Sequence, residues 1–237
     1  MKPTLLIIGA GSRVGQATAD TFAAAGYTIA VASRSGKIGS KYKHFTFDAS
    51  KPETVRDLFS EVRRTTGIPS VVIYNAYSAH ITRPETPFES PIDEFQADMD
   101  VNATSVWVAA GETVKCFEDL GLDALGTTGG TFIFTGNLLN LAAAPGFLTF
   151  GMGKSAAAHL IQHLALVAYP GKPYKFYYGD QRHADGSPMP TGLSGLAHAE
   201  TYLQLAKDPE QKPWLHTFVE GQGYAEFPRQ EVWVPGS

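Results

Sequence analysis

The chain has 237 residues, of which 43% are hydrophobic and 18% charged, and its formal net charge is −4. This length and composition predict one globular domain spanning residues 1–237, with enough apolar material for a large core. The slightly acidic balance disfavours nucleic acid and membranes as partners, and a single cysteine without a signal-peptide pattern at the N-terminus predicts a cytoplasmic protein.

The N-terminal stretch predicts a strand, a glycine turn and a helix. Residues 5–8 are a short, partly β-branched apolar run, which is typical of a buried strand. Gly9, Gly11 and Gly15 follow, and small and apolar residues recur at helical spacing from Val14 onward. Such a unit begins a dinucleotide-binding fold, in which backbone N–H groups and the helix N-terminus bind a pyrophosphate. A tight turn without a ligand is the alternative.

Residues 28–32 predict a second buried strand, and its end determines which dinucleotide is expected. This end lies about 20 residues after the glycine turn, where such folds contact the adenosine ribose. The residues there are Ser33, Arg34, Ser35 and Lys37. An acidic residue would accept hydrogen bonds from a free 2′-hydroxyl, whereas arginine pairs with a 2′-phosphate. Arg34 therefore favours NADP over NAD, and a solvated basic loop is the alternative.

The remaining chain alternates between strands and helices. Strands are predicted at 44–47, 71–74, 129–135, 174–178 and 214–219, and helices at 51–66, 90–118, 148–169 and 193–207, with a polar loop at 180–190. Ser90 and Pro91 predict an N-cap and a first helical position. Asn102 and Lys154 fall on inward apolar stripes of two helices and need polar partners there. The alternation predicts a parallel sheet covered on both faces.

In these motifs the chain resembles the short-chain dehydrogenase/reductase family over nearly its whole length. The glycine turn, Asp48, Asn75-Ala76, Asn102 and Lys154 stand in the order of that family. The resemblance implies a single-domain α/β Rossmann fold with a doubly wound parallel sheet of about seven strands, usually assembled as a homodimer or homotetramer. It also implies hydride transfer between NAD(P) and a small-molecule carbonyl or alcohol.

The resemblance also implies roles for individual residues. Asp48 would lie beside the adenine, Lys154 would bind the nicotinamide ribose hydroxyls, and Asn102 would hold a water in a proton relay. Together with the interpretation of Arg34, the cofactor-binding set becomes Gly9, Gly11, Ser12, Arg13, Val14, Gly15, Ser33, Arg34, Asp48, Ala49, Asn75, Ala76 and Lys154. The catalytic set becomes Lys154, Asn102 and Asn137.

Two departures from the family affect catalysis. The family's catalytic tyrosine stands four residues before the lysine, where this chain has Phe150. Four residues make one helical turn, so the side chains of Phe150 and Lys154 share a face, but a phenyl ring has no proton to give to an alkoxide. The family's substrate-binding serine falls at Asn137, whose amide donates hydrogen bonds but does not relay a proton as a hydroxyl does.

Two other departures affect the cofactor. Arg13 replaces the middle glycine of the family's turn, where we expect it to clamp a phosphate. Gly179-Asp180 replaces the Pro-Gly pair that lies against the nicotinamide. Short segments at 135–137, 153–156, 176–180 and 198–200 resemble fungal members of the family, which implies an atypical fungal subfamily. Nucleotide binding is therefore expected to persist while the standard acid is lost.

Five residues near the carboxyl ends of the strands are candidates for a replacement acid. They are Tyr77, His80, Tyr178, Asp180 and His183, and each also has a structural alternative as a core, loop or turn residue. Three functions follow: an NADP-dependent oxidoreductase with a rearranged site, a redox-neutral isomerase, cyclase or lyase, and a non-catalytic NADP-binding protein. No Cys/His cluster has metal-ligand spacing, so we expect no metal site.

We also expect a dimer across the helices predicted at 90–118 and 148–169. The second helix is rich in small residues that admit another helix: Gly151, Gly153, Ala156, Ala157 and Ala158. Packing against the protein's own sheet is the alternative, and both can hold on different faces.

Overall fold

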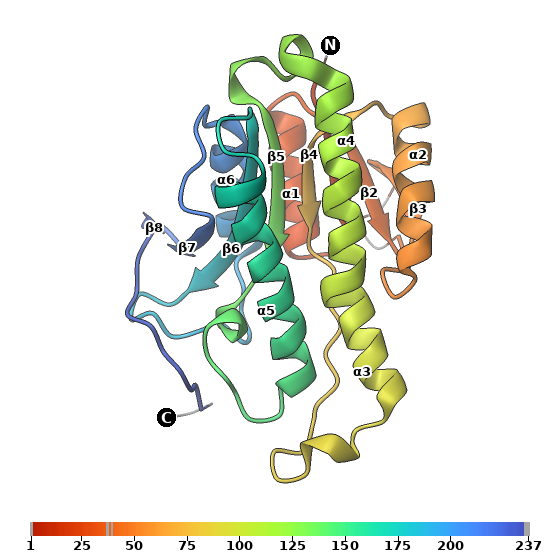
Figure 1. Ribbon diagram of the computed structural model, residues 1–237. Helices are drawn as coiled ribbons and strands as arrows, with labels where there is room; N and C mark the ends of the chain where they lie inside the picture. The colour runs from red at the N-terminus through yellow and green to blue at the C-terminus, as the bar shows by residue number, and fades with distance from the viewer. Residues whose placement is uncertain (1, 37, 39, 235–237) are drawn as a thin grey trace.

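An eight-stranded sheet runs through the centre of the protein (Figure 1). The computed structural model describes residues 2–36, 38 and 40–234, so the predicted contribution of Lys37 lies outside the described residues. The strands are β1 (Thr4–Ile8), β2 (Thr28–Ser33), β3 (Lys43–Thr46), β4 (Pro69–Tyr74), β5 (Gly130–Thr135), β6 (Tyr174–Arg182), β7 (Leu215–Val219) and β8 (Gly223–Tyr224). Their order is β3-β2-β1-β4-β5-β6-β7-β8. Seven strands are parallel, as predicted, and the short β8 adds one antiparallel pairing at the edge.

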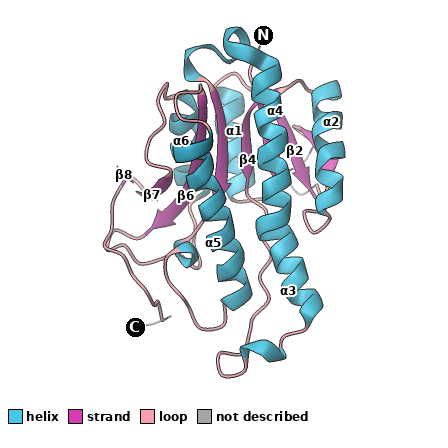
Figure 2. Ribbon diagram, viewed as in Figure 1, coloured by secondary structure: helices cyan, strands magenta, loops and turns pink. Residues whose placement is uncertain are grey.

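Helices cover both faces of this sheet (Figure 2). One face carries α1 (Val14–Ala24) and α6 (Gly195–Lys207), and the other carries α2 (Val55–Thr65), α4 (Ser105–Leu125) and α5 (Leu148–His163). The helix α3 (Ile92–Met99) extends beyond the carboxyl edge of the sheet. The predicted α/β fold with a doubly wound parallel sheet is confirmed. Among the described residues, no helix is long and apolar enough to cross a membrane.

The two apolar layers explain why the parallel strands are continuous apolar runs. Leu5 and Ile7 of β1 belong to the cluster under α1 and α6, whereas Leu6 and Ile8 belong to the cluster under α2, α4 and α5. Alternate side chains of a strand point to opposite faces, so a strand covered on both faces is apolar at every position. Because the strands themselves are apolar, the polar side chains of the candidate site lie in the segments that follow their carboxyl ends.

The long predicted helix over 90–118 is divided into three parts. Helix α3 is followed by a π-helical segment (Asp100–Thr104) and then by α4, which continues to Leu125. The predicted Ser90 cap is wrong, because Pro91 precedes the helix in an extended conformation and no side chain caps it. The helix predicted at 148–169 likewise ends as α5 at His163 and continues as a π-helical segment (Leu164–Ala168).

Strand β6 is longer than predicted. It continues to Arg182, so Gly179 and Asp180 are strand residues rather than the start of a loop. The reason is pairing with β7, which extends from Tyr178 opposite Leu215 to Arg182 at the other end. The charged sequence at 180–182 resembles a loop, but its charges neutralise each other inside the sheet.

Candidate active site

The glycine turn after β1 packs directly on the end of β4. Gly9 has a φ of +85°, and a Cβ there would lie 2.2 Å from the backbone nitrogen of Ala76. The side-chain amide of Asn75 donates a hydrogen bond to the Gly9 carbonyl at 2.9 Å. A Cβ on Gly15 would lie 2.8 Å from the Cα of Ala10, so this glycine lets α1 approach the turn. The turn is therefore fixed by its neighbours and requires glycine at two positions.

The N-terminus of α1 fits an anionic group. No side chain caps the helix at Arg13, and its first turn contains no acidic residue. Gly11, Ser12 and Arg13 are exposed, and a Cβ on Gly11 would have no atom within 4 Å, so the space above the turn is open. An uncapped helix N-terminus carries partial positive charge and free N–H groups. These residues, with Val14 as the first helical residue, can accept a pyrophosphate.

Arg34 lies on a turn that Ser33 holds in place. The Ser33 hydroxyl is 3.0 Å from Nε2 of His44 and accepts a hydrogen bond from the N–H of Gly36 at 3.3 Å. Ser33 is also a predicted cofactor-binding residue, and that role stays a prediction. In the structure its hydroxyl is bonded within the protein, where it positions the turn that presents the exposed Arg34.

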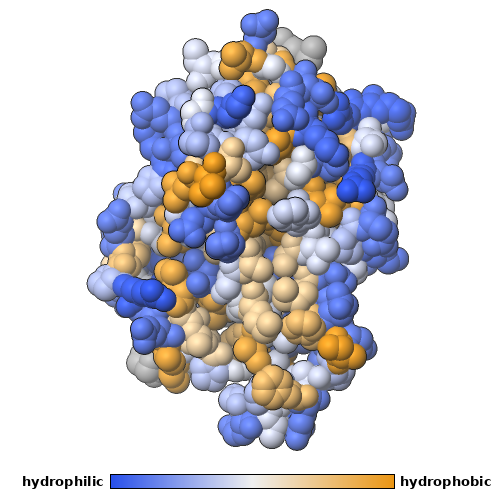
Figure 3. Space-filling view, in the orientation of Figure 1, coloured by the Kyte–Doolittle hydropathy of each residue, from blue (hydrophilic) through white to orange (hydrophobic). Residues whose placement is uncertain are grey.

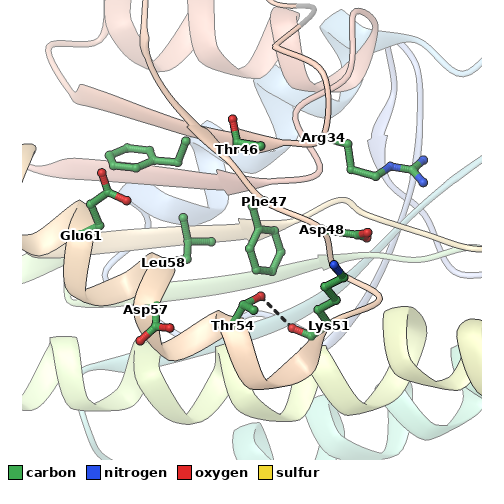
Figure 4. A pocket seen from close by; sticks show the side chains of 10 residues that line it. Arg34, Thr46, Phe47, Asp48, Lys51, Thr54, Asp57, Leu58 and Glu61 are labelled. Carbon is green, nitrogen blue, oxygen red and sulfur yellow. Dashed lines mark hydrogen bonds between the residues drawn. The ribbon is translucent and has the colours of Figure 1, made fainter.

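A cavity of about 490 Å³ lies between β3 and α2, next to this turn (Figure 4). Figure 4 shows the charged ends of Arg34, Asp48 and Lys51 gathered at one end of it. Burial opposes ionisation of Asp48, but hydrogen bonds from Ser50 and the nearby charge of Arg34 lower the pKa of its carboxyl. Ala49 accepts a hydrogen bond from the hydroxyl of Ser105 at 2.7 Å, which ties this edge to α4.

Lys154 projects from α5 into the carboxyl edge of the sheet. Its side chain is buried, and Nζ donates a hydrogen bond to the carbonyl of Thr135 at 2.9 Å. The ring centroids of Phe134 and Phe150 lie 4.4 and 5.1 Å from Nζ, which adds cation–π attraction. Burial lowers the pKa of Lys154 to about 7, although the charge of Asp180 opposes this shift. The ammonium of Lys154 therefore has one polar partner, the Thr135 carbonyl, and two cation–π contacts.

The position one turn before Lys154 is apolar. The ring of Phe150 is buried and lies 5.8 Å from the ring of Tyr77 and 6.4 Å from the ring of Phe147. No hydroxyl stands on this face of α5 beside the ammonium, because Thr149 directs its own hydroxyl to Asp98. Phe150 therefore forms an aromatic wall one helical turn before Lys154.

Asn137 is held firmly at the end of β5. Its side-chain oxygen accepts a hydrogen bond from the N–H of Leu139 and so caps the 3₁₀ turn Leu138–Asn140. The hydroxyl of Tyr178 accepts from the N–H of Asn137 at 3.1 Å and donates to its carbonyl at 2.9 Å. The Asn137 backbone is thus fixed by a buried phenol, while its side chain shapes the loop that follows.

Asn102 joins three segments at the same edge. Its side-chain amide donates to the carbonyls of Ser78 and Asp98 at 2.6 and 2.9 Å. A Cβ on Gly153 would lie 2.5 Å from the Cβ of Asn102, so α5 contacts the π-helical segment directly. The predicted buried amide is confirmed, and its partners are backbone carbonyls.

Three of the five candidate acids are unsuited to the task. The Tyr178 hydroxyl is occupied by Asn137, and burial raises its pKa well above the ordinary value. Asp180 is buried in an ion pair with Arg182, whose Nε and Nη2 lie 2.6 Å from its Oδ2. His183 is exposed on a turn. Tyr77 is largely exposed and packs on Phe150, whereas His80 is half-buried beside Asp98.

Asp98 is the residue that sequence reasoning missed. It is fully buried and forms hydrogen bonds with Ser78, His80 and Thr149. Acidic side chains are seldom buried, so composition gives no reason to place one in the core. The available signal is its position four residues before Asn102, which puts two polar side chains on one inward face of the helix.

Comparisons with known proteins agree with this arrangement. The short chain dehydrogenase family profile matches residues 3–171. A protein from Cryptosporiopsis sp. (strain 8999), described as short chain dehydrogenase/reductase dmxR12, is 41% identical over 239 residues, which cover 95% of each chain.

Two solved structures share the fold. A metagenomic short-chain oxidoreductase in complex with NADP has a TM-score of 0.76 at 13% identity and covers 92% of this chain and 96% of its own. An NADH-dependent reductase, A1-R′, complexed with NAD has a TM-score of 0.74 at 20% identity, with coverages of 87% and 89%. From the family profile and the 41% identical relative together, the chain belongs to the short-chain dehydrogenase/reductase family.

Proposed function

We propose that this protein is an NADP(H)-dependent oxidoreductase whose proton donor differs from the family's tyrosine. The observation that carries the proposal is the open, uncapped N-terminus of α1 at the same sheet edge as the buried ammonium of Lys154. The first feature fits the pyrophosphate of a dinucleotide. The Lys154 ammonium is the hydrogen-bond donor that would bind the nicotinamide ribose hydroxyls, although Phe150 would replace the family's tyrosine.

The residues present account for each part of the cofactor. The pyrophosphate would lie on the turn from Gly9 to Gly15, with Gly11, Ser12 and Val14 at the helix N-terminus and Arg13 adding a positive charge. Asp48 and Ala49 would border the adenine, and Asn75 and Ala76 would lie along the dinucleotide. When bound, NADPH would supply the hydride. The short-chain oxidoreductase that shares this fold at a TM-score of 0.76 is in complex with NADP, which supports this choice.

Arg34 would select NADP(H) by pairing with the 2′-phosphate. It is exposed, and its turn is fixed by Ser33, so the guanidinium needs no rearrangement of the backbone to reach an anion. Asp48 is close enough to Arg34 for its pKa to be lowered by that charge. Lys51 adds a second cation at the same end of the cavity, as Figure 4 shows. This end of the cavity favours an anionic group.

Asn137 would orient the oxygen of the substrate. Its side-chain oxygen is engaged by Leu139, and among the described residues its Nδ2 has no hydrogen-bond partner. A fixed amide N–H can donate to a carbonyl oxygen and stabilise the negative charge that develops there. Asn137 would therefore replace the hydrogen-bonding role of the family's serine, but it would transfer no proton.

The mouth of the site favours an apolar substrate. Exposed apolar side chains lie on the segment after β4 and on α3 and α5, the elements that extend past the carboxyl edge of the sheet: Tyr77, Ile81, Phe88, Ile92 and Leu148. Figure 3 shows apolar surface over the lower parts of α5 and α3. Together with the Phe150 wall, this surface predicts a hydrophobic ketone, aldehyde or alcohol.

The test is NADPH consumption measured against a panel of hydrophobic ketones and aldehydes. We expect steady oxidation of NADPH with at least one carbonyl, one equivalent for each alcohol formed. The loss of both the phenol and the serine hydroxyl favours the redox-neutral alternative, so the same panel should be incubated with a redox-inactive NADPH analogue. Turnover that persists with the analogue would contradict the oxidoreductase and support an isomerase, cyclase or lyase. Cofactor binding without any turnover would support a non-catalytic protein.

A further inference from the structure

A polar cluster lies beside Phe150 and is not used by the proposed cofactor site. We call it the Asp98 cluster, and it consists of Ser78, His80, Asp98 and Thr149. The hydroxyls of Ser78 and Thr149 donate to the Asp98 carboxylate at 2.7 and 2.6 Å. The backbone N–H of His80 donates at 3.0 Å, and its Nδ1 lies 2.8 Å from Oδ1. The carboxylate therefore has four hydrogen-bond partners, contributed by three residues on two segments of the chain.

These contacts keep Asp98 ionised despite its burial. Burial alone would raise the pKa of the carboxyl, but the hydrogen bonds from Thr149, His80 and Ser78 outweigh it and lower the pKa. A buried anion is stable only with such partners. An ionised carboxylate can only accept hydrogen bonds, so its contact with Nδ1 fixes the imidazole ring and holds a proton on Nδ1.

The other nitrogen of His80 is free to exchange a proton. The His80 side chain is 37% exposed, whereas that of Asp98 is 0% exposed. Among the described residues, Nε2 of His80 has no hydrogen-bond partner. Asp98, from α3, is the charged group that contacts the ring, while Ser78 and Thr149 contribute neutral hydroxyls. One side of the imidazole is anchored and the other is accessible.

The cluster is joined to the turn of α5 that carries Phe150. Thr149 directly precedes Phe150 in α5, and the ring of Tyr77 packs on the ring of Phe150 at 5.8 Å. The carbonyl of Ser78 accepts a hydrogen bond from Asn102 at 2.6 Å. The residues just before His80 are therefore attached to Phe150 and Asn102 at the same sheet edge as Lys154.

We propose that His80, oriented by Asp98, is the proton donor and acceptor of this enzyme in place of the family's tyrosine. The role rests on the proposed oxidoreductase function. In carbonyl reduction, hydride adds to the carbonyl carbon and the C=O electron pair moves to oxygen. The proton on Nε2 of the imidazolium then moves to that oxygen, which gives the alcohol and a neutral imidazole. Water restores the proton through the exposed side of the ring, and alcohol oxidation reverses these steps.

A purely structural role for the cluster makes different predictions. Asp98 would then only tie α3 to α5 and to the segment after β4. Removing His80 would change thermal stability, but the dependence of rate on pH would not change. Kinetics at several pH values therefore separate the two roles.

The experiment compares His80→Gln, Asp98→Asn and the control His183→Gln with the wild-type protein, using NADPH and a reducible hydrophobic carbonyl. His183 is an exposed histidine near the end of β6. We expect His80→Gln to lower kcat by about 10²–10⁴-fold, the usual contribution of general acid–base catalysis, with little change in KM or NADPH affinity. Because a general acid acts only in its protonated form, the wild-type reduction rate should fall as the pH rises. That fall should vanish in His80→Gln and move to lower pH in Asp98→Asn. Imidazole added to His80→Ala should restore part of the rate.

The outcomes distinguish the two proposals. Unchanged kcat and an unchanged pH profile in His80→Gln, with active wild-type protein, would overturn the role of His80 and leave the oxidoreductase intact. Loss of activity in His183→Gln but not in His80→Gln would do the same. Wild-type protein that binds NADPH but reduces no carbonyl would overturn the oxidoreductase, and the role of His80 with it. If Asp98→Asn fails to fold, Thr149→Val weakens the same carboxylate contact and should shift the pH profile in the same direction.

Discussion

Nζ of Lys154 donates a hydrogen bond to the backbone carbonyl of Thr135 at 2.9 Å, across the edge where β5 ends. This carbonyl is the oxygen acceptor found for an ammonium whose side chain is only 3% exposed. A buried charge with one carbonyl and two aromatic rings is poorly compensated for the loss of water. The buried ammonium of Lys154 therefore lowers the stability of the folded protein. Its presence is explained if it binds a ligand.

Replacement of Lys154 by methionine should stabilise the cofactor-free protein. Among the described residues no salt bridge involves Lys154, so an apolar side chain of similar size removes the cost of burying the charge without leaving an ion-pair partner behind. The pKa of Lys154 is about 7 in the folded protein, against about 10.4 in an unfolded chain. Below pH 7 both states are protonated, so the cost of burying the charge is fully present. Between pH 7 and about 10.4 the unfolded state binds more protons, and wild-type stability rises with pH.

The gain from Lys154→Met should therefore be largest below pH 7 and shrink towards pH 10. Thermal unfolding of both proteins at a series of pH values measures it. A variant that is less stable than the wild type at pH 6 would contradict the view that the ammonium is poorly compensated.

Arg34→Asp should weaken NADPH binding by at least ~10-fold, because a charge-assisted pair of about 1.4 kcal/mol would be lost. NADH binding should not weaken, because the new carboxylate can accept hydrogen bonds from the free 2′-hydroxyl, so calorimetry with both dinucleotides isolates the contribution of the 2′-phosphate. Arg64→Asp is a matched control, since Arg64 is exposed on α2 away from the predicted phosphate site. Equal wild-type affinities for NADPH and NADH would reject the assignment.

Phe150→Tyr should not create an ordinary ketone reductase. The new phenol would stand one turn from Lys154, and a functional acid is worth about 10²–10⁴-fold in rate. However, the Asn137 side-chain oxygen caps the turn that follows it, and Asp180 is committed to Arg182. We expect no large rise in ketone reduction from Phe150→Tyr alone or combined with Asn137→Ser. A large rise from the single change would show that the pocket has remained a standard reductase pocket.

We predict a homodimer across α4 and α5. Trp107 on α4 is 69% exposed, and Ala156 on α5 is exposed, whereas Gly153 and Ala157 are buried within the protein itself. Figure 3 shows apolar or neutral surface over the lower parts of these helices and hydrophilic surface over the upper part of α4. Trp107→Lys should therefore shift the protein towards monomer in sedimentation experiments. Leu122→Lys is the control, because Leu122 is 68% exposed on α4 but outside the predicted contact. A monomeric wild-type protein at micromolar concentration would contradict the prediction.

Short sequence patterns are enough to predict the N-terminal strand, turn and helix and the burial of two polar side chains. The strand, glycine turn and helix at the N-terminus follow from residue types at fixed spacing, and the buried positions of Asn102 and Lys154 follow from helical periodicity. Asp98, Asp180 and Arg182 were not expected in the core, because each is stable there only through partners contributed by the folded chain. The π-helical segments likewise depend on packing, such as the contact of Gly153 with Asn102.

The proposed function requires hydride transfer from NADPH at a site where Phe150, which has no hydroxyl, lies one helical turn before Lys154. The most direct test uses NADPH deuterated at C4 of the nicotinamide, with the hydrophobic carbonyl that gives the fastest NADPH consumption, and mass spectrometry of the product. We predict one deuterium on the former carbonyl carbon for each NADPH consumed, in wild-type protein and in His183→Gln. Product formed without deuterium, or at the same rate with a redox-inactive analogue, would contradict the oxidoreductase function.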